Sequence, residues 1–155
     1  MDAKNTERPL LGTVICPLQS TAALADVFAE LATALENGGN LQDGAGFAKA
    51  VLLRESAAST ALPIGVAMPH ARLPELERII LSFGRLPYEM LWGETAVDCV
   101  FLMAVPSKQP TAYLALVQKL TRLLRVTEKL EELRSLTEAS ACRQWLLQQL
   151  ELDAE

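Results

Sequence analysis

The chain has 155 residues, half of them apolar, which fits a single domain (residues 1–155) with one sizeable core. Its net charge of −5 and pI near 5.0 argue against a nucleic-acid binder, which needs a basic face, and suit a basic protein partner better. Three cysteines (Cys16, Cys99 and Cys142) lie far apart in the sequence, which argues against a disulfide scaffold or zinc site and fits a reducing cytoplasm.

The first third of the chain predicts a leader, a short strand and two helices. Residues 1–12 are expected to be a loose N-terminal leader, and their polar start shows no signal peptide. Residues 13–15 predict a short strand. Ser20 is expected to cap a helix that runs to Asn37, because apolar residues recur there at spacings of three and four. Asp43 is expected to cap a second helix, from residue 44 to about 55.

The middle of the chain predicts strands. Pro63 and Pro69 bracket a short apolar run, which predicts a short strand that ends in an exposed loop at His70. Residues 77–86 predict a further strand. Residues 97–105 are almost continuously apolar, as expected of a central strand covered on both faces. This run is too short to cross a bilayer, so no membrane insertion is expected.

The last third predicts helices over residues 111–124 and then two more, capped by Thr127 and Thr137 and ending near Leu150. The order of helices, strands and helices predicts an α/β fold. We expect a three-layer sandwich in which a small mixed β-sheet is covered by helices on both faces.

His70 is the only histidine, and a lone histidine is more often a packing or surface residue than a catalytic one. Its neighbours change this interpretation. Pro69 fixes the backbone, Ala71 leaves the ring approachable, and Arg72 supplies a guanidinium that matches phosphate oxygens. A neutral imidazole beside cationic donors is what a phosphoryl-accepting nucleophile requires.

The sequence around His70 carries a family resemblance. Residues 65–72 read Gly-Val-Ala-Met-Pro-His-Ala-Arg and follow an Arg-Glu pair (Arg54-Glu55) and a Ser-Thr pair (Ser59-Thr60). This pattern resembles the signature of the fructose/mannitol-type enzyme IIA family, which includes the nitrogen-regulatory enzyme IIA. The order of predicted elements is similar from about residue 18 to 150.

The resemblance implies roles for the matching residues. His70 corresponds to the phosphorylated histidine, Arg54 to the active-site arginine, and Ser59 and Thr60 to the loop that lines the phosphate site. Spacing alone would leave Arg54 and Glu55 as solvated charges at a helix end and Ser59-Thr60 as turn residues.

One position departs from the family pattern. Tyr113 stands where a second histidine is common, so it can donate a hydrogen bond to phosphate but cannot become cationic. An equally good interpretation is a ring that packs on the surface at a helix start.

The implied function is that of a phosphoryl carrier in a phosphoenolpyruvate-dependent phosphotransferase system. His70 would accept phosphate from an HPr-like phosphocarrier protein, and the chain would act mainly as a regulator of the nitrogen type on a protein target. Two alternatives stay open: a sugar-transport enzyme IIA that passes phosphate to an enzyme IIB, and a vestigial interaction module that is not phosphorylated. A homodimer is possible, since leucine-rich helix surfaces could pack against a second copy.

Other chemistry is less well supported. Ser59 and Asp98 could complete a hydrolase triad with His70, but no Gly-x-Ser-x-Gly elbow is present. No nucleotide-binding loop of the Gly-x-x-x-x-Gly-Lys-Ser/Thr type is present either, so we expect no dissociable cofactor and no metal, and a phosphoprotein as donor.

Three further features of the sequence depend on the surrounding fold. Asp98 interrupts the apolar strand and would need a cation, for which Arg72 and Arg85 are the candidates. The charge run at residues 128–134 predicts a solvated helix face. Trp92 and Trp145 are expected to fill core edges or to anchor an interface.

Overall fold

The computed structural model describes residues 8–154. Within these residues the chain forms helices and strands in the following order: β1 (Leu10–Ile15), α2 (Leu24–Asn37), α3 (Gly44–Ala57), β2 (Val66–Ala67), β3 (His70–Leu73), β4 (Ile80–Trp92), β5 (Thr95–Pro106), α4 (Ala112–Leu124), α5 (Thr127–Ser135), α6 (Ala139–Gln149) and β6 (Asp153–Ala154).

The strands form one mixed sheet. Its order is β2-β5-β4-β1-β6, and β3 pairs with β5 beyond the end of β2. β4 and β5 are antiparallel, whereas β1, β2 and β3 run parallel to the strands they join. β5 is therefore an inner strand, and every residue from Cys99 to Pro106 is buried, as the apolar run predicted.

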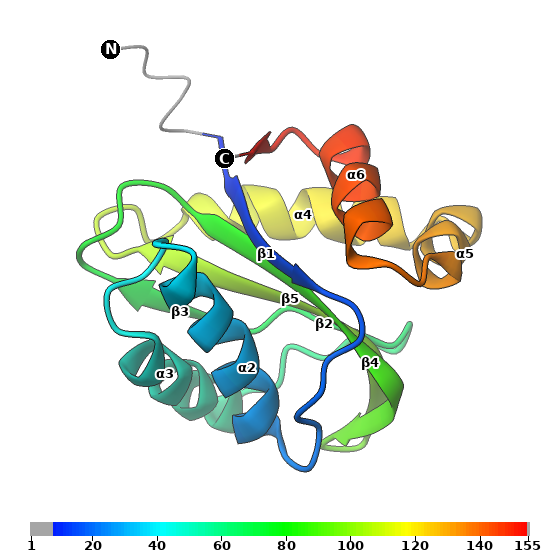
Figure 1. Ribbon diagram of the computed structural model, residues 1–155, viewed down its shortest axis with the longest axis horizontal. Coiled ribbons are helices and arrows are strands. Elements are labelled where there is room, and N and C mark those ends of the chain that lie inside the picture. Colours follow the sequence, from blue (N-terminus) through cyan, green and yellow to red (C-terminus); the bar gives the residue numbers. More distant parts are fainter. Residues whose placement is uncertain (1–7, 155) are drawn as a thin grey trace.

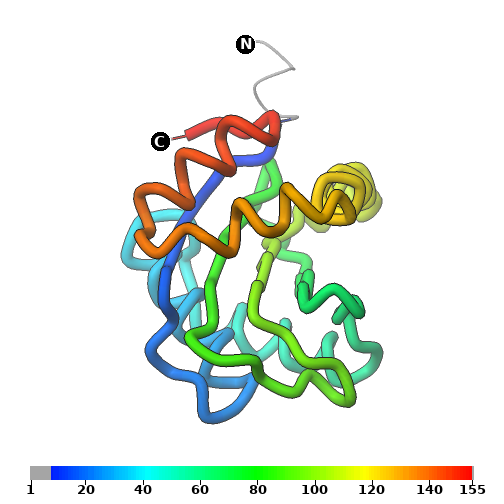
Figure 2. The backbone as a smooth tube through the Cα atoms, turned by 90° about the vertical axis from the view of Figure 1, so that its right-hand side faces the viewer, coloured from blue at the N-terminus to red at the C-terminus, as the bar shows by residue number. Residues whose placement is uncertain are grey.

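Helices cover both faces of this sheet, which confirms the predicted three-layer arrangement. In Figures 1 and 2, α2 and α3 lie on one side of the strands and α4, α5 and α6 on the other. The core on the α2/α3 side contains Phe28, Phe47 and Trp92. The core on the opposite side contains Phe83 and Phe101, whose ring centroids lie 5.0 Å apart.

The N-terminal prediction is partly wrong. The expected leader at residues 1–12 overlaps β1, because Leu10 and Leu11 pair with Ile80 and Leu81 of β4. Residues 1–7 of that leader lie outside the described part of the chain.

The predicted Ser20 cap is also wrong, because α2 begins at Leu24 after Ala23. The backbone N–H groups of Gln19 and Ser20 donate instead to the Glu30 carboxylate, at 2.8 and 2.7 Å, which keeps this segment outside the helix.

Of the other predicted caps, one is confirmed. The Asp43 side chain accepts a hydrogen bond from the Gly46 N–H at 3.0 Å, at the start of α3. Thr127 is the first residue inside α5, and α6 begins after Glu138, so neither Thr127 nor Thr137 is a cap.

His70 lies in a strand rather than in the expected exposed loop. It is the first residue of β3, where it pairs with Met103, and it is only 8% exposed. The preceding Pro69 lies between β2 and β3, and its carbonyl accepts a hydrogen bond from the Met103 N–H at 2.9 Å. The chain therefore resumes its pairing with β5 as soon as it has passed the proline.

Candidate functional site

The residues around His70 form a pocket of about 430 Å³ at the β3 edge of the sheet. Helix α3 approaches this edge from one face of the sheet and α4 from the other (Figure 1). The pocket is lined by Ala50 and Arg54 of α3, His70, Ala71 and Arg72 of β3, and Tyr113 of α4.

The His70 ring is held on two sides. The Tyr113 ring stacks on it with centroids 4.5 Å apart and an angle of 25° between the planes. On the other side, Nδ1 lies 3.5 Å from the Met68 carbonyl oxygen. A stacked and largely buried ring keeps its orientation, and His70 is one of the residues that line the pocket.

The surroundings of His70 favour its neutral form. Burial lowers the pKa of His70 below its usual value of 6.5, the Met68 carbonyl opposes this, and the positive charges of Arg54 and Arg72 add to the lowering. Glu55 acts in the opposite direction to the arginines. A neutral imidazole is a nucleophile, whereas an imidazolium is not.

The two arginines of the pocket are exposed. Arg54 lies in the last turn of α3, where its Nη1 donates to the Ala58 carbonyl at 3.3 Å. Arg72 lies two residues beyond His70 on the same strand. Residues i and i+2 of a strand point to the same face, so the guanidinium of Arg72 extends from the side that carries the imidazole. Both cations are placed to receive an anion in the pocket.

Ser59 and Thr60, which the resemblance assigns to the phosphate site, do not line this pocket. The Ser59 hydroxyl accepts a hydrogen bond from the Ala61 N–H at 3.2 Å. The Thr60 hydroxyl accepts from the Met68 N–H at 3.1 Å and donates to Glu55 at 2.9 Å. Thr60 therefore does not face the pocket but binds the backbone of Met68, two residues ahead of His70.

Glu55 is the important residue that sequence reasoning assigned wrongly. It is 6% exposed rather than a solvated helix-end charge, and its Oε2 accepts hydrogen bonds from Trp92 Nε1 at 2.7 Å and from the Thr60 N–H at 2.6 Å. The contact with Trp92, 37 residues away, left no signal in the sequence.

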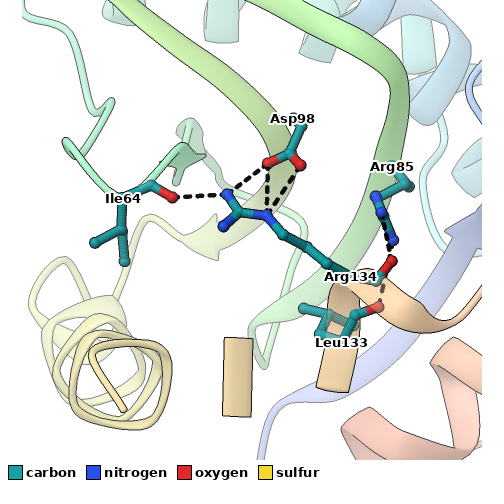
Figure 3. Close-up of polar contacts among 5 residues, drawn as sticks. All are labelled: Ile64, Arg85, Asp98, Leu133 and Arg134. Carbon is teal, nitrogen blue, oxygen red and sulfur yellow. Dashed lines mark hydrogen bonds and ion pairs between the residues drawn. The ribbon is translucent and has the colours of Figure 1, made fainter. Parts of the chain in front are cut away.

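The partner of Asp98 is Arg134 of α5, and both predicted candidates are wrong (Figure 3). Arg134 binds the carboxylate through Nε at 2.9 Å and Nη2 at 2.7 Å, and Nη2 also donates to the Ile64 carbonyl. Arg85 instead donates to the carbonyls of Leu133, Arg134 and Leu136. The charge run at residues 128–134 thus ends in a structural ion pair.

Gly65, the first residue of the motif, packs directly on this ion pair. Its φ of +88° is a conformation that residues with side chains rarely adopt. A Cβ at this position would lie 2.5 Å from Nη2 of Arg134. The motif begins with glycine because the backbone there is left-handed and the guanidinium lies against it.

Among residues 8–154, no cluster of three or more histidine, cysteine or acidic side chains is placed to hold a metal ion. In the same part of the chain, no helix combines the length and apolar character that a membrane span requires. The functional groups in the pocket lining are one imidazole, two guanidinium groups and a phenol.

The described residues thus form a three-layer α/β domain whose candidate site lies at an edge strand that begins with a histidine. The sequence matches the family described as "Phosphoenolpyruvate-dependent sugar phosphotransferase system, EIIA 2" over residues 14–149. The chain belongs to this family, as the motif around His70 predicted.

Two relatives illustrate the range of the family. The chain is 37% identical over 95 residues to the nitrogen regulatory protein of Bradyrhizobium diazoefficiens, a match that covers 59% of this chain and 61% of that protein. It is 33% identical over 103 residues to the fructose-specific EIIABC component of the Bacillus subtilis phosphotransferase system, covering 64% of this chain and 16% of the relative. The chain thus spans less than two thirds of the length of either relative.

Solved structures show the same fold. Nitrogen regulatory protein IIA-Ntr from Neisseria meningitidis has a TM-score of 0.75 and 24% identity, and the match covers 93% of this chain and 99% of that one. Enzyme IIA of the Escherichia coli mannitol system, in complex with phosphorylated enzyme IIB, has a TM-score of 0.60 and 18% identity, with 96% of both chains covered. At these identities the likeness concerns the fold alone.

Proposed function

We propose that this chain is a phosphoryl carrier that accepts a phosphoryl group on His70 from an HPr-like phosphocarrier protein and acts chiefly as a regulator of the nitrogen type. The observation that carries the proposal is the pocket itself, in which a neutral, stacked imidazole lies beside Arg54 and Arg72. The match to the nitrogen regulatory protein of Bradyrhizobium diazoefficiens supports the regulatory assignment.

The geometry indicates which ring nitrogen reacts. A carbonyl oxygen can only accept a hydrogen bond, so the contact between Nδ1 and the Met68 carbonyl favours the tautomer with the proton on Nδ1. Nε2 then carries the free lone pair. It attacks the phosphorus of the carrier's phosphohistidine; the new N–P bond forms as the donor N–P bond breaks, in line.

The arginines supply the electrostatic part of this mechanism. Arg54 and Arg72 balance the charge on the phosphoryl oxygens, and the Tyr113 hydroxyl can donate one hydrogen bond to them. Tyr113 cannot supply the cationic charge of a second histidine, so the phosphorylated form would be less assisted in passing the group on. A slow onward transfer suits a switch that is sensed by a protein target in the cytoplasm.

A second function is supported by one comparison. The chain is 33% identical over 103 residues to the fructose-specific EIIABC component of the Bacillus subtilis phosphotransferase system. Under this alternative, His70 would pass its phosphoryl group to an enzyme IIB domain during sugar uptake.

The direct test is phosphorylation from phosphoenolpyruvate through the general carrier enzymes. Mass spectrometry should show an acid-labile increase of one phosphate on the wild-type chain and none on His70→Ala. Arg54→Ala should slow the reaction by roughly ten- to a hundredfold, as expected when a charge-stabilising donor is removed. Arg122→Ala, which removes the same charge from an exposed position outside the pocket, should react at the wild-type rate.

The proposal fails if the wild type acquires no adduct from its cognate carriers, or if His70→Ala still acquires one. A subsequent incubation with enzyme IIB separates the two functions, because only a transport component should lose its phosphoryl group quickly to that partner.

A further inference from the structure

A chain of hydrogen bonds leads from the buried Glu55 to the reacting imidazole. The Glu55 carboxylate binds the Thr60 hydroxyl at 2.9 Å, this hydroxyl binds the Met68 N–H at 3.1 Å, and the Met68 carbonyl faces Nδ1 of His70 at 3.5 Å. Glu55 and Thr60 are not part of the pocket lining, so they would not contact a phosphoryl group there directly.

The direction of each bond in this chain is fixed by chemistry. The Met68 N–H can only donate, so the Thr60 oxygen accepts from it and its own hydroxyl proton points to Glu55. Trp92 Nε1 and the Thr60 N–H are also donors only. Three donors therefore converge on one side chain, which matches a carboxylate that only accepts.

The last contact of this hydrogen-bond series, between the Met68 carbonyl and His70 Nδ1, is weak and depends on how firmly the Met68 backbone is held. A separation of 3.5 Å between Nδ1 and the Met68 carbonyl is long for a hydrogen bond, so it could not orient a mobile ring alone. The backbone of Met68 is, however, anchored on both sides: its N–H donates to Thr60, and the carbonyl of the following Pro69 accepts from the Met103 N–H at 2.9 Å. Met68 itself is only 4% exposed. A fixed carbonyl that faces Nδ1 selects the tautomer with the proton on that nitrogen.

We propose that Glu55 and Thr60 are positioning residues for His70, which hold the backbone at Met68 so that the Met68 carbonyl keeps the ring proton on Nδ1 and leaves Nε2 open to the phosphoryl group. This inference deepens the proposed function and rests on it for the identity of the reaction. The tautomer itself is a property of the unphosphorylated protein and can be measured without any phosphoryl donor.

The test compares Thr60→Val with Thr60→Ser. Valine keeps the shape of threonine but removes the hydroxyl, whereas serine keeps the hydroxyl and is the matched control. Nitrogen-15 NMR of the untagged protein reports one histidine, because His70 is the only one in the chain. We expect the Nδ1–H tautomer to dominate in the wild type and Thr60→Ser, and a mixture of both tautomers in Thr60→Val.

The phosphorylation rate should follow the tautomer. A misplaced ring is expected to slow Thr60→Val by about tenfold or more, while Thr60→Ser stays within about twofold of the wild type. Trp92→Phe removes one donor from Glu55 but leaves the bonds between Thr60 and Met68 in place. It should therefore lower stability without changing the tautomer, which separates positioning from general damage to the fold.

Should Thr60→Val not fold, Glu55→Gln gives the same readout. Its amide would face the Thr60 oxygen with a donor and leave the hydroxyl proton without an acceptor. An unchanged tautomer and rate in the folded variant would overturn the inference. If no variant or wild type is phosphorylated, the proposed function fails, while the tautomer comparison still decides whether Glu55 and Thr60 position the ring.

Discussion

At the scale of single residues, the state of His70 results from competing influences. Burial disfavours the imidazolium and the two arginines repel it, whereas the Met68 carbonyl and Glu55 favour it. Burial and the two arginines together outweigh the Met68 carbonyl and Glu55, so the pKa of His70 lies below 6.5. The residue that we propose as the phosphoryl acceptor is thereby kept mostly neutral in the range where a free histidine would be half protonated.

A pH titration of the single histidine checks this balance. Because its pKa is below 6.5, we expect more than half of His70 to be neutral at pH 6.5, measured from the imidazole NMR signals of the untagged protein. Arg54→Ala and Arg72→Ala should each raise the pKa of His70, because each removes a repelling charge. Arg122→Ala is the control and should leave it unchanged.

The same shift sets the sign of a stability effect. The unfolded chain binds the His70 proton more tightly than the folded one, so this residue destabilises the fold as the pH falls below 6.5 towards its lower folded pKa. His70→Gln should lose less stability over this interval than the wild type does. A titration midpoint at or above 6.5 would contradict the burial argument.

The sequence contained much of the pocket but not its supporting contacts. The motif and the family resemblance predicted four residues at one site, and the structure brings these four together in one pocket, although their roles stay predictions: Arg54, His70, Arg72 and Tyr113. Thr60 could not be placed correctly, because its hydroxyl is bound by Glu55, which Trp92 in turn holds from 37 residues away. Such a side-chain contact follows from tertiary packing and leaves no local pattern.

At the scale of the elements, the ion pair between Asp98 and Arg134 joins three parts of the fold. Asp98 belongs to β5, Arg134 to the last turn of α5, and the Ile64 carbonyl, which Arg134 also binds, to the segment ahead of β2 (Figure 3). Hydrogen bonding to Asp98 raises the pKa of Arg134. The pair therefore holds the start of the motif against the centre of the sheet.

Breaking this pair should cost more than breaking an exposed one. The side chains of Asp98 and Arg134 are 19% and 33% exposed, so we expect Asp98→Ala to lower the free energy of unfolding by roughly 1–3 kcal/mol. Lys129→Ala breaks the exposed pair with Glu132 and should cost less than about 0.5 kcal/mol. Chemical denaturation measures both, and equal costs would show that the ion pair is not a structural tie.

Elements with a strong local signal were predicted well, and those set by distant contacts were not. The β5 strand follows from its apolar run, and the start of α3 from the Asp43 cap. The start of α2 was predicted too early. The carboxylate of Glu30, within α2, accepts hydrogen bonds from the backbone N–H groups of Gln19 and Ser20 and so holds them outside the helix. The strand at His70 was missed because its partner, Met103, lies far along the chain.

At the scale of the whole molecule, the candidate site lies where the two helical layers meet. Arg54 comes from α3 on one face of the sheet, Tyr113 from α4 on the other, and His70 from the edge strand between them (Figure 1). The pocket exists only when both layers are packed. Inner strands β4 and β5 contribute alternate residues to each core: Leu81 and Phe101 to one, Ile80 and Leu102 to the other.

Because the two cores share these strands, neither layer can unfold alone without exposing the side chains of the other, and we expect a single cooperative transition.

The two tryptophans report on opposite faces: Trp92 lies in the core with α2 and α3, and Trp145 in the core with α6. In Trp92→Phe and in Trp145→Phe, the remaining tryptophan fluorescence should change at the same denaturant concentration as the far-ultraviolet circular dichroism of that variant. The comparison is made within each variant, because Trp92→Phe also removes a hydrogen bond to Glu55 and lowers the midpoint itself. A fluorescence midpoint that departs from the dichroism in either variant would mean that the layers unfold separately, and the pocket would then be lost before the fold.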